Sequence, residues 1–280
     1  MTKLLSKQWQ QWIGENLQRK CAVEDMLKAM LDAKISEETA LLNIKAYQAA
    51  PIDCTASCDG FQQEASLLFQ LENNLVTSDG QLITVAMRLD APDIVLLDNF
   101  MTHAECDELC EYSKNSLTNS TVVNDATGEG VSHEHRSSQG THFTFGQNAL
   151  VRKLETRICE LTCIPASKGE GIQILNYVKG GEYRPHFDYF PDNEGGRANM
   201  VQGGQRVITI IMYLSDVMAG GATIFPEINL NIYPKKGSAL YFSYFNSLQQ
   251  VDSRTLHGGA PVVSGEKWIA TKWIRERKYS

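Results

Sequence analysis

The length, charge and apolar pattern of this sequence exclude several classes of protein. A chain of 280 residues can bury at least one sizeable core, and it favours a main domain with a smaller companion. The formal net charge of −7 makes a nucleic acid or an acidic membrane surface an unfavourable main partner. No apolar run approaches the roughly 18 residues of a membrane-spanning helix, so we expect no membrane partner.

The N-terminus and the cysteines indicate a cytoplasmic location. The first residues lack the continuous apolar core and the small-residue cleavage site of a signal peptide. The seven cysteines include Cys106/Cys110 and Cys159/Cys163, which are spaced i, i+4 on expected helices, and no C-x-x-C pair. We therefore expect reduced, mostly buried thiols in a cytoplasmic protein.

Residues 1–90 are expected to form a mainly helical N-terminal domain of unknown role. Apolar side chains recur at i, i+3 and i+4 over residues 9–17 and again over residues 26–31. Ser36, followed by two glutamates, has the pattern of a helix N-cap, and a further helix is expected over residues 64–75. The apolar stripes predict the core of a small bundle. One face of that bundle could alternatively bind a partner.

The second domain is expected over residues 91–280. It begins with a short buried strand at residues 93–100, and the sequence from Thr102 to Glu105 has the pattern of a capping box that opens a helix ending near Lys114.

Residues 115–141 are rich in Asn, Ser, Thr and Gly and predict a long loop. Loops of this length inside compact domains often cover active sites. His133, His135 and His142 lie in or beside it. They are either solvated loop histidines or ligands of a second metal site. No carboxylate–histidine spacing repeats in this segment, which favours solvated histidines.

The sequence changes character after an amphipathic helix expected at residues 149–161. From Gly171 onward, short strands alternate with Gly and Pro turns. The strands are expected at residues 172–178, 183–190, 206–214, 222–225, 230–233, 239–244, 257–263 and 267–274. Eight short strands preceded by two helices predict an α+β fold, in which a double-stranded β-helix, or jelly roll, is backed by helices.

His186 and Asp188 are the first candidate site residues. Residues i and i+2 of a strand point to the same face, so these two side chains lie together. If His257 joins them, the result is a set of two histidines and one carboxylate, which suits non-haem Fe(II) and leaves three positions for substrate and oxygen. The alternative is that the H-x-D pattern arose by chance.

Lys267 follows His257 by ten residues, which fits two antiparallel strands joined by a short turn and would return the lysine beside the metal. It shares a strand face with Ile269, Thr271 and Trp273. A lysine inside a barrel is unfavourable unless its charge is paired, and a dicarboxylate co-substrate chelating iron at its other end would supply the partner. The alternative is a surface lysine on an edge strand.

Several motifs follow one another in a single order over about two-thirds of the chain. They are Asp98-Asn99-Phe100, Arg136-Ser137-Ser138, Glu170…Gln173…Tyr177, Tyr183…His186…Asp188, Gly203-Gly204-Gln205-Arg206, Met212-Tyr213-Leu214, Gly220-Gly221-Ala222-Thr223, Pro234-Lys235-Lys236-Gly237, Leu256-His257 and Gly265-Glu266-Lys267-Trp268. Together they make the region from Ile94 to Arg275 resemble the catalytic domain of the prolyl 4-hydroxylases, which are Fe(II)/2-oxoglutarate-dependent dioxygenases.

The resemblance implies roles for ten residues. The iron ligands would be His186, Asp188 and His257. Lys267 would bind the distal carboxylate of 2-oxoglutarate, helped by the hydroxyls of Tyr177 and Thr223. The peptide groove would be lined by Tyr183, Arg206, Trp273 and Glu170. The alternative is that the aromatic side chains pack on the rim of the barrel and that the arginine forms an ion pair at the surface.

The implied activity is hydroxylation of a prolyl residue, at C4, in a peptide or protein. The cofactors and co-substrates would be Fe(II), 2-oxoglutarate and O2, with ascorbate as reductant and succinate and CO2 as products. The alternatives are a hydroxylase of a free amino acid or of another side chain, and a non-catalytic sensor. Residues 191–204 are long and Gly-rich, so the groove could have its own shape. The first 90 residues do not resemble the collagen enzyme, which favours a stand-alone cytoplasmic enzyme.

Overall fold

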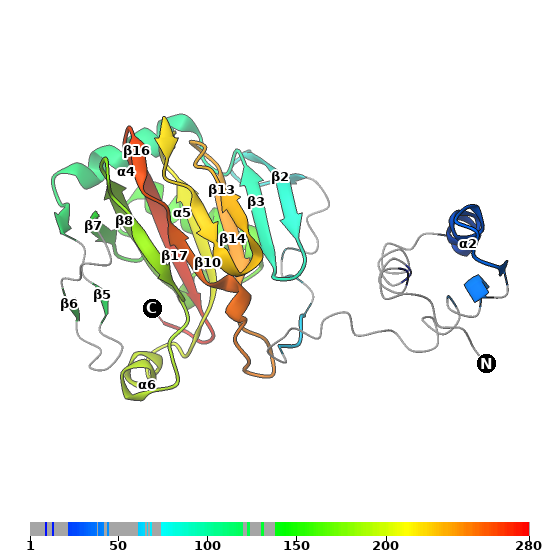
Figure 1. Ribbon diagram of the computed structural model, residues 1–280. Helices are drawn as coiled ribbons and strands as arrows, with labels where there is room; N and C mark the ends of the chain where they lie inside the picture. The colour runs from blue at the N-terminus through cyan, green and yellow to red at the C-terminus, as the bar shows by residue number, and fades with distance from the viewer. Residues whose placement is uncertain are drawn as a thin grey trace. The chain divides into compact units, whose positions relative to one another are not determined.

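The computed structural model describes the larger part of the chain (Figure 1). The described residues are 22–37, 39–41, 61–64, 74–119, 122–123, 130–131 and 138–279, with the single positions 9, 13, 44, 66 and 68. The chain divides into two compact units, Met1–Gly60 and Phe61–Ser280. None of the described helices is long and apolar enough to cross a membrane.

The first unit contains helix α2 (Val23–Asp32), whose buried face carries Met26 and Met30. These side chains pack with Ile13, Ala40 and Ile44 in a small apolar cluster, as their spacing in the sequence predicts.

The second unit is built on a sheet of nine strands. Its order is β1-β2-β3-β14-β10-β17-β8-β7-β4, and every neighbouring pair is antiparallel. The strands are β1 (Asn74–Val76), β2 (Leu82–Leu89), β3 (Ile94–Asp98), β4 (Thr118–Asn119), β7 (Gln139–Phe143), β8 (Gly169–Tyr177), β10 (Arg206–Tyr213), β14 (Ala239–Ser243) and β17 (Lys267–Arg275).

A second, four-stranded sheet faces the first. Its order is β13-β12-β15-β9, from strands β13 (Leu230–Ile232), β12 (Thr223–Phe225), β15 (His257–Gly259) and β9 (Tyr183–His186). Two small sheets pair β11 (Ala219–Gly220) with β16 (Val262–Ser264), and β5 (Val122–Val123) with β6 (Gly130–Val131).

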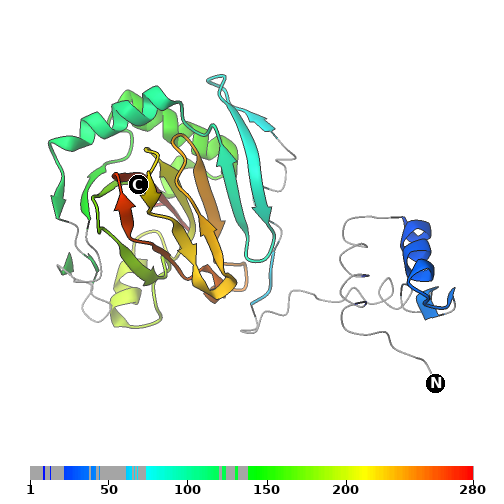
Figure 2. The ribbon, with the colours of Figure 1, turned by 45° about the horizontal axis from the view of Figure 1, so that its top comes forward.

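The helices cover one face of the nine-stranded sheet (Figure 2). These are α4 (His103–Lys114) and α5 (Ala149–Thr162), while the short α6 (Glu194–Met200) lies beyond the lower end of the sheet in Figure 1. The capping box predicted for α4 is present with both of its hydrogen bonds. The Thr102 side chain accepts from the backbone N–H of Glu105, and the Glu105 side chain accepts from the backbone N–H of Thr102. Three short 3-10 turns complete the fold: Ala166–Lys168, Pro226–Ile228 and Ser253–Thr255.

Strand alternation sends side chains to two separate cores. Ile208, Ile210 and Met212 of β10 pack with the helices, whereas Ile211 and Tyr213 pack against the second sheet. This is the expected consequence of the two-residue repeat of a strand buried on both faces. The jelly roll backed by helices is therefore confirmed, and the space between its sheets is where the site lies.

The boundary between the units differs from the predicted one at 90/91. Strands β1 and β2 belong to the large sheet because β2 pairs with β3, so the compact unit begins at Phe61. The helix predicted over residues 64–75 is wrong wherever the structure describes that range: Glu64, Ser66 and Leu68 are not helical, and Asn74 and Leu75 form part of β1.

Three further expectations need correction. The loop predicted at residues 115–141 contains strands β4, β5 and β6 and the start of β7, although residues 120–121, 124–129 and 132–137 lie outside the described part of the chain. The single strand predicted at residues 257–263 is two strands in different sheets, β15 and β16. The four described cysteines are all free thiols, as expected. Most of them were expected to be buried, but only Cys106 is.

Candidate active site

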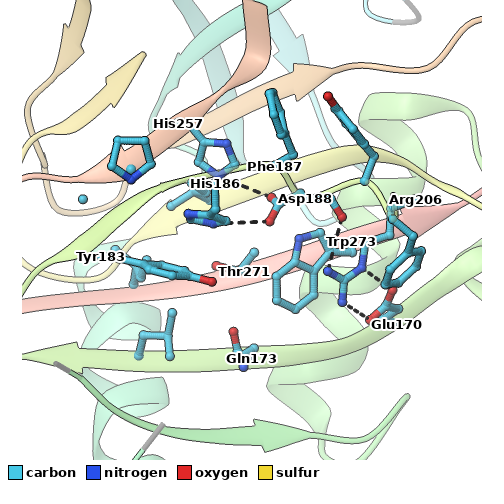
Figure 3. A pocket seen from close by; sticks show the side chains of 18 of the residues that line it. Glu170, Gln173, Tyr183, His186, Phe187, Asp188, Arg206, His257, Thr271 and Trp273 are labelled. Atoms are coloured by element: carbon cyan, nitrogen blue, oxygen red, sulfur yellow. Dashed lines mark hydrogen bonds and ion pairs between the residues drawn. The ribbon is translucent and has the colours of Figure 1, made fainter. Parts of the chain in front are cut away.

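His186, Asp188 and His257 converge between the two sheets. His186 ends β9 and His257 begins β15, and the two are direct partners in the antiparallel register. One ligand atom from each of the three side chains lies within 4.8 Å of the others. Asp188 lies to one side of the two rings, with its carboxylate oxygens 3.6 Å from His186 Nε2 and 3.5 Å from His257 Nε2 (Figure 3). Within the described residues this is the one cluster with such geometry.

Backbone carbonyls orient both imidazole rings. Nδ1 of His186 lies 2.9 Å from the carbonyl oxygen of Arg184, and Nδ1 of His257 lies 3.0 Å from that of Thr255. If each Nδ1 carries the proton and donates it, each Nε2 presents a lone pair to the centre of the cluster. This is the usual arrangement of metal-binding histidines, in which the second nitrogen donates to a carbonyl or carboxylate.

The protonation states also favour a cation. Burial lowers the pKa of His257 to about 4, so its imidazole is neutral at pH 7. Burial alone would raise the pKa of Asp188, but the two imidazoles and Arg206 hold it well below its ordinary value. A neutral imidazole and an ionised carboxylate are the forms that bind metals.

Thr209 is a partner of the cluster that the sequence did not reveal. Its hydroxyl on β10 donates to Asp188 Oδ2 at 2.6 Å and is 3.1 Å from the hydroxyl of Tyr244. The aspartate therefore has one oxygen held by the large sheet, which restricts the direction in which the carboxylate faces.

Lys267 lies across the cavity from the cluster, but not as a hairpin partner of His257. β15 belongs to the four-stranded sheet and β17 to the nine-stranded one, and the segment between them is not a simple turn but contains β16, which pairs with β11. The residue is only 3% exposed. Burial lowers its pKa to about 8, and no carboxylate of the described residues acts to raise it.

Two hydroxyl-bearing residues flank Lys267 in the cavity wall. Tyr177 of β8 is its partner in the register, and the ammonium is 5.8 Å from the centre of the Tyr177 ring. Thr223 of β12 approaches from the opposite sheet, with its hydroxyl held by a hydrogen bond from Tyr213 at 2.8 Å. Lysine, tyrosine and threonine thus form one polar group in the cavity wall, separate from the His186–Asp188–His257 cluster.

Three of the four predicted groove residues, Arg206, Trp273 and Glu170, form one stacked group, and Tyr183 lies apart from them beside His186 (Figure 3). The guanidinium of Arg206 lies 3.9 Å from the centre of the Trp273 ring and donates to both carboxylate oxygens of Glu170, at 2.7 and 2.9 Å. Burial disfavours this charge, but Glu170 holds the pKa of Arg206 above its ordinary value. Tyr183 stacks on His186 with ring centres 3.7 Å apart. The arginine pair is partly buried in the cavity wall, with 19% of the Arg206 side chain and 14% of the Glu170 side chain exposed.

All ten predicted site residues line one open cavity of about 1130 Å³. Lys267, Ile269, Thr271 and Trp273 all face it, as strand alternation predicts. His142 also lines the cavity, whereas His133 and His135 lie outside the described residues.

The donor set fits the groups expected in this cavity. Two oriented imidazoles and an ionised carboxylate, with open space on one side, match the facial set that holds Fe(II). The buried ammonium of Lys267, without a carboxylate partner among the described residues, matches an anionic group of a small dicarboxylate.

Comparison with known proteins agrees with this chemistry. Residues 172–275 match the 2OG-Fe(II) oxygenase superfamily. Prolyl 4-hydroxylase 5 of Arabidopsis thaliana is 39% identical over 207 residues, which cover 67% of this chain and 70% of the relative. The chain belongs to the prolyl 4-hydroxylase family.

Other members of the family extend the likeness. Probable prolyl 4-hydroxylase 8 of Arabidopsis thaliana is 34% identical over 249 residues, which cover 82% of each chain. Among solved structures, the viral collagen prolyl hydroxylase of Paramecium bursaria chlorella virus 1, in complex with 2-oxoglutarate, has a TM-score of 0.52 and 28% identity. That match covers 65% of this chain and 95% of the viral one. As an oxygenase of this family, the protein uses Fe(II), 2-oxoglutarate and O2.

Proposed function

We propose that this family member hydroxylates prolyl residues, at C4, within a peptide or protein substrate. The observation that carries the proposal is the position of His186, Asp188 and His257 opposite Lys267 across one cavity that also holds the Arg206–Trp273 stack. The curated relatives and the viral structure bear the names of prolyl hydroxylases, which supports the same substrate class.

Each of the ten residues has a role in this proposal. His186, Asp188 and His257 would hold Fe(II). Lys267 binds the distal carboxylate of 2-oxoglutarate, and the hydroxyls of Tyr177 and Thr223 donate to the same group. Together with O2, the bound iron and 2-oxoglutarate would supply the oxidising chemistry and release succinate and CO2. The chain itself positions the reactants and keeps their surroundings dry.

The groove residues orient the substrate. Glu170 engages Nε and Nη2 of Arg206, while Nη1 has only a long contact, 3.4 Å, with the carbonyl oxygen of Asp188. Nη1 is therefore placed to donate to a substrate carbonyl. The flat faces of Tyr183 and Trp273 suit the rigid ring of proline, because extended proline-rich peptides dock on aromatic surfaces.

In this proposal ascorbate would serve as the reductant that keeps the iron in the Fe(II) state. The protein works in the cytoplasm, and its partners include neither a nucleic acid nor a membrane. The free thiols of the four described cysteines are consistent with a reducing compartment.

The test is succinate formation with Fe(II), 2-oxoglutarate, ascorbate and proline-rich peptides, together with mass spectrometry for one added oxygen on the peptide. Asp188→Ala should abolish succinate formation, and retained activity would place the iron elsewhere. Substitution of Arg206 or Trp273 should raise KM for the peptide and spare peptide-independent turnover of 2-oxoglutarate. Hydroxylation of free amino acids but not of peptides would favour the first alternative, and absence of any turnover would favour a sensor.

A further inference from the structure

The cavity has a wall that none of the predicted site residues provides. Gly195, Gly196 and Asn199 of α6 line it, in the Gly-rich segment that follows Pro191. The side chain of Asn193 caps this short helix by accepting from the backbone of Gly196 at 2.8 Å. A side chain at Gly196 would collide with the carbonyl of Pro191, so the helix lies directly on its own incoming chain.

Arg275 connects this wall to the groove. Its Nη2 donates to the carbonyl oxygens of Asn199 and Gln202, both at 2.6 Å. Its Nη1 lies 3.2 Å from the Glu170 carboxylate, which also holds Arg206. The guanidinium is buried, with only 2% of the residue exposed. One planar group thus joins the backbone of α6 to the carboxylate that orients the groove arginine, which a lysine could not do with the same geometry.

The segment after β17 lies beside α6 and adds a side chain to the same wall. The Tyr279 ring lines the cavity and lies 5.0 Å from the guanidinium carbon of Arg275. Gln202 donates to the carbonyl oxygen of Tyr279 at 2.7 Å. Gly203 has a φ of +79°, and a side chain there would come within 2.9 Å of the Tyr279 ring. Glycine is therefore required for this close approach.

We infer that Arg275 is a positioning residue that fixes α6 as a wall of the substrate groove, and that Tyr279 contributes its ring to that wall as a contact for a residue flanking the target proline. The inference rests on the proposed function for its substrate. The tether itself depends only on contacts within this chain.

The test compares Arg275→Met with Arg277→Met in the full-length protein. Arg277 is a matched control, because its side chain is 62% exposed and reaches α6 only through a 3.5 Å contact with the carbonyl of Met200. Hydrogen exchange measured by mass spectrometry should show exchange over residues 194–202 accelerated about tenfold or more in Arg275→Met and unchanged in the control, since two charge-assisted hydrogen bonds are lost.

Kinetics separate positioning from general damage. Arg275→Met should raise KM for a proline-rich peptide about tenfold, with KM for 2-oxoglutarate and peptide-independent turnover within about twofold of the parent. Arg275→Lys should recover part of the loss. Tyr279→Ala should raise the peptide KM without changing exchange in α6, while Tyr279→Phe should match the parent.

Unchanged exchange in Arg275→Met, or a raised KM for 2-oxoglutarate equal to that for peptide, would overturn the inference. A normal peptide KM in Tyr279→Ala would remove that ring from the groove. If the parent hydroxylates no peptide, the proposed function fails, whereas the exchange experiment still decides whether Arg275 holds α6.

Discussion

Replacing Lys267 by methionine should stabilise the protein without ligands and weaken its binding of 2-oxoglutarate. The side chain is 3% exposed, and burial lowers its pKa from 10.5 to about 8. At about 1.4 kcal/mol for each tenfold change in proton affinity, holding the charged form at pH 7 costs roughly 3 kcal/mol. Methionine has a similar length and no charge, so Lys267→Met should recover much of this free energy of unfolding.

The same substitution should reduce the affinity for 2-oxoglutarate. A hydrogen bond to a charged group contributes roughly 1.5–3 kcal/mol, so its loss predicts an affinity about 10- to 150-fold weaker. Calorimetric titration with 2-oxoglutarate and urea unfolding at pH 7 measure the two effects separately. The control is Lys235→Met, because Lys235 is 65% exposed and pairs with Asp98 at the surface. It should change stability by less than about 1 kcal/mol and leave the affinity intact.

The pH dependence gives an independent check on Lys267. Its folded-state pKa is below its unfolded value, so between pH 8 and pH 10.5 the unfolded chain binds more protons at this site. The contribution of this group to stability therefore rises with pH over that window, by roughly 3 kcal/mol in all. The stability advantage of Lys267→Met should be full below pH 8 and should disappear near pH 10.5. A variant that is less stable than the parent at pH 7, or that binds 2-oxoglutarate normally, would refute this reasoning.

Three further substitutions test other parts of the structure. Thr209→Val removes the hydroxyl that donates to Asp188, and metal affinity measured by titration should fall about 10- to 100-fold; unchanged affinity would mean that this hydrogen bond does not orient the carboxylate. Lys272→Met leaves the Glu155 carboxylate buried without its 2.8 Å partner, and urea unfolding should show a loss of about 3–5 kcal/mol, largely recovered by adding Glu155→Leu. If the double variant is no more stable than the single one, the unpaired charge is not the cause. Thr102→Ala breaks the capping box of α4, which should lower the free energy of unfolding by about 1 kcal/mol, whereas Thr118→Ala at the exposed end of β4 should lower it by less.

Strand alternation is a local rule, so the sequence predicted that Lys267, Thr271 and Trp273 share one face of β17, the face that lines the cavity. The rule does not account for Asp188, because the strand predicted over residues 183–190 ends at His186, and Asp188 lies in a bend beyond β9 from which its side chain still reaches the ring of His186. The capping box of α4 and the apolar stripe of α5 are equally local, and both helices form where they were expected.

What the sequence did not reveal depends on contacts between distant segments. Nothing near Thr209 shows that its hydroxyl meets Asp188, because the two meet only when β10 and the end of β9 face each other. Strand β16 separates from β15 by pairing with β11, and although Pro261 stands between the two strands, the local sequence does not encode that distant partner. Helix α6 is short and Gly-rich, and its position depends on the backbone carbonyls that Arg275 holds.

The direct pairing of His257 with His186 makes the four-stranded sheet a folding-dependent metal binder. Its two imidazoles come from strands far apart in the chain. Their nitrogens meet only when β9 and β15 pair in the register that places His257 opposite His186. A ferrous ion should therefore bind the native chain and not the unfolded one, and it raises stability in proportion to the logarithm of its concentration. The concentration of available iron would then determine the thermal stability of the enzyme and its resistance to proteolysis, in addition to its turnover rate.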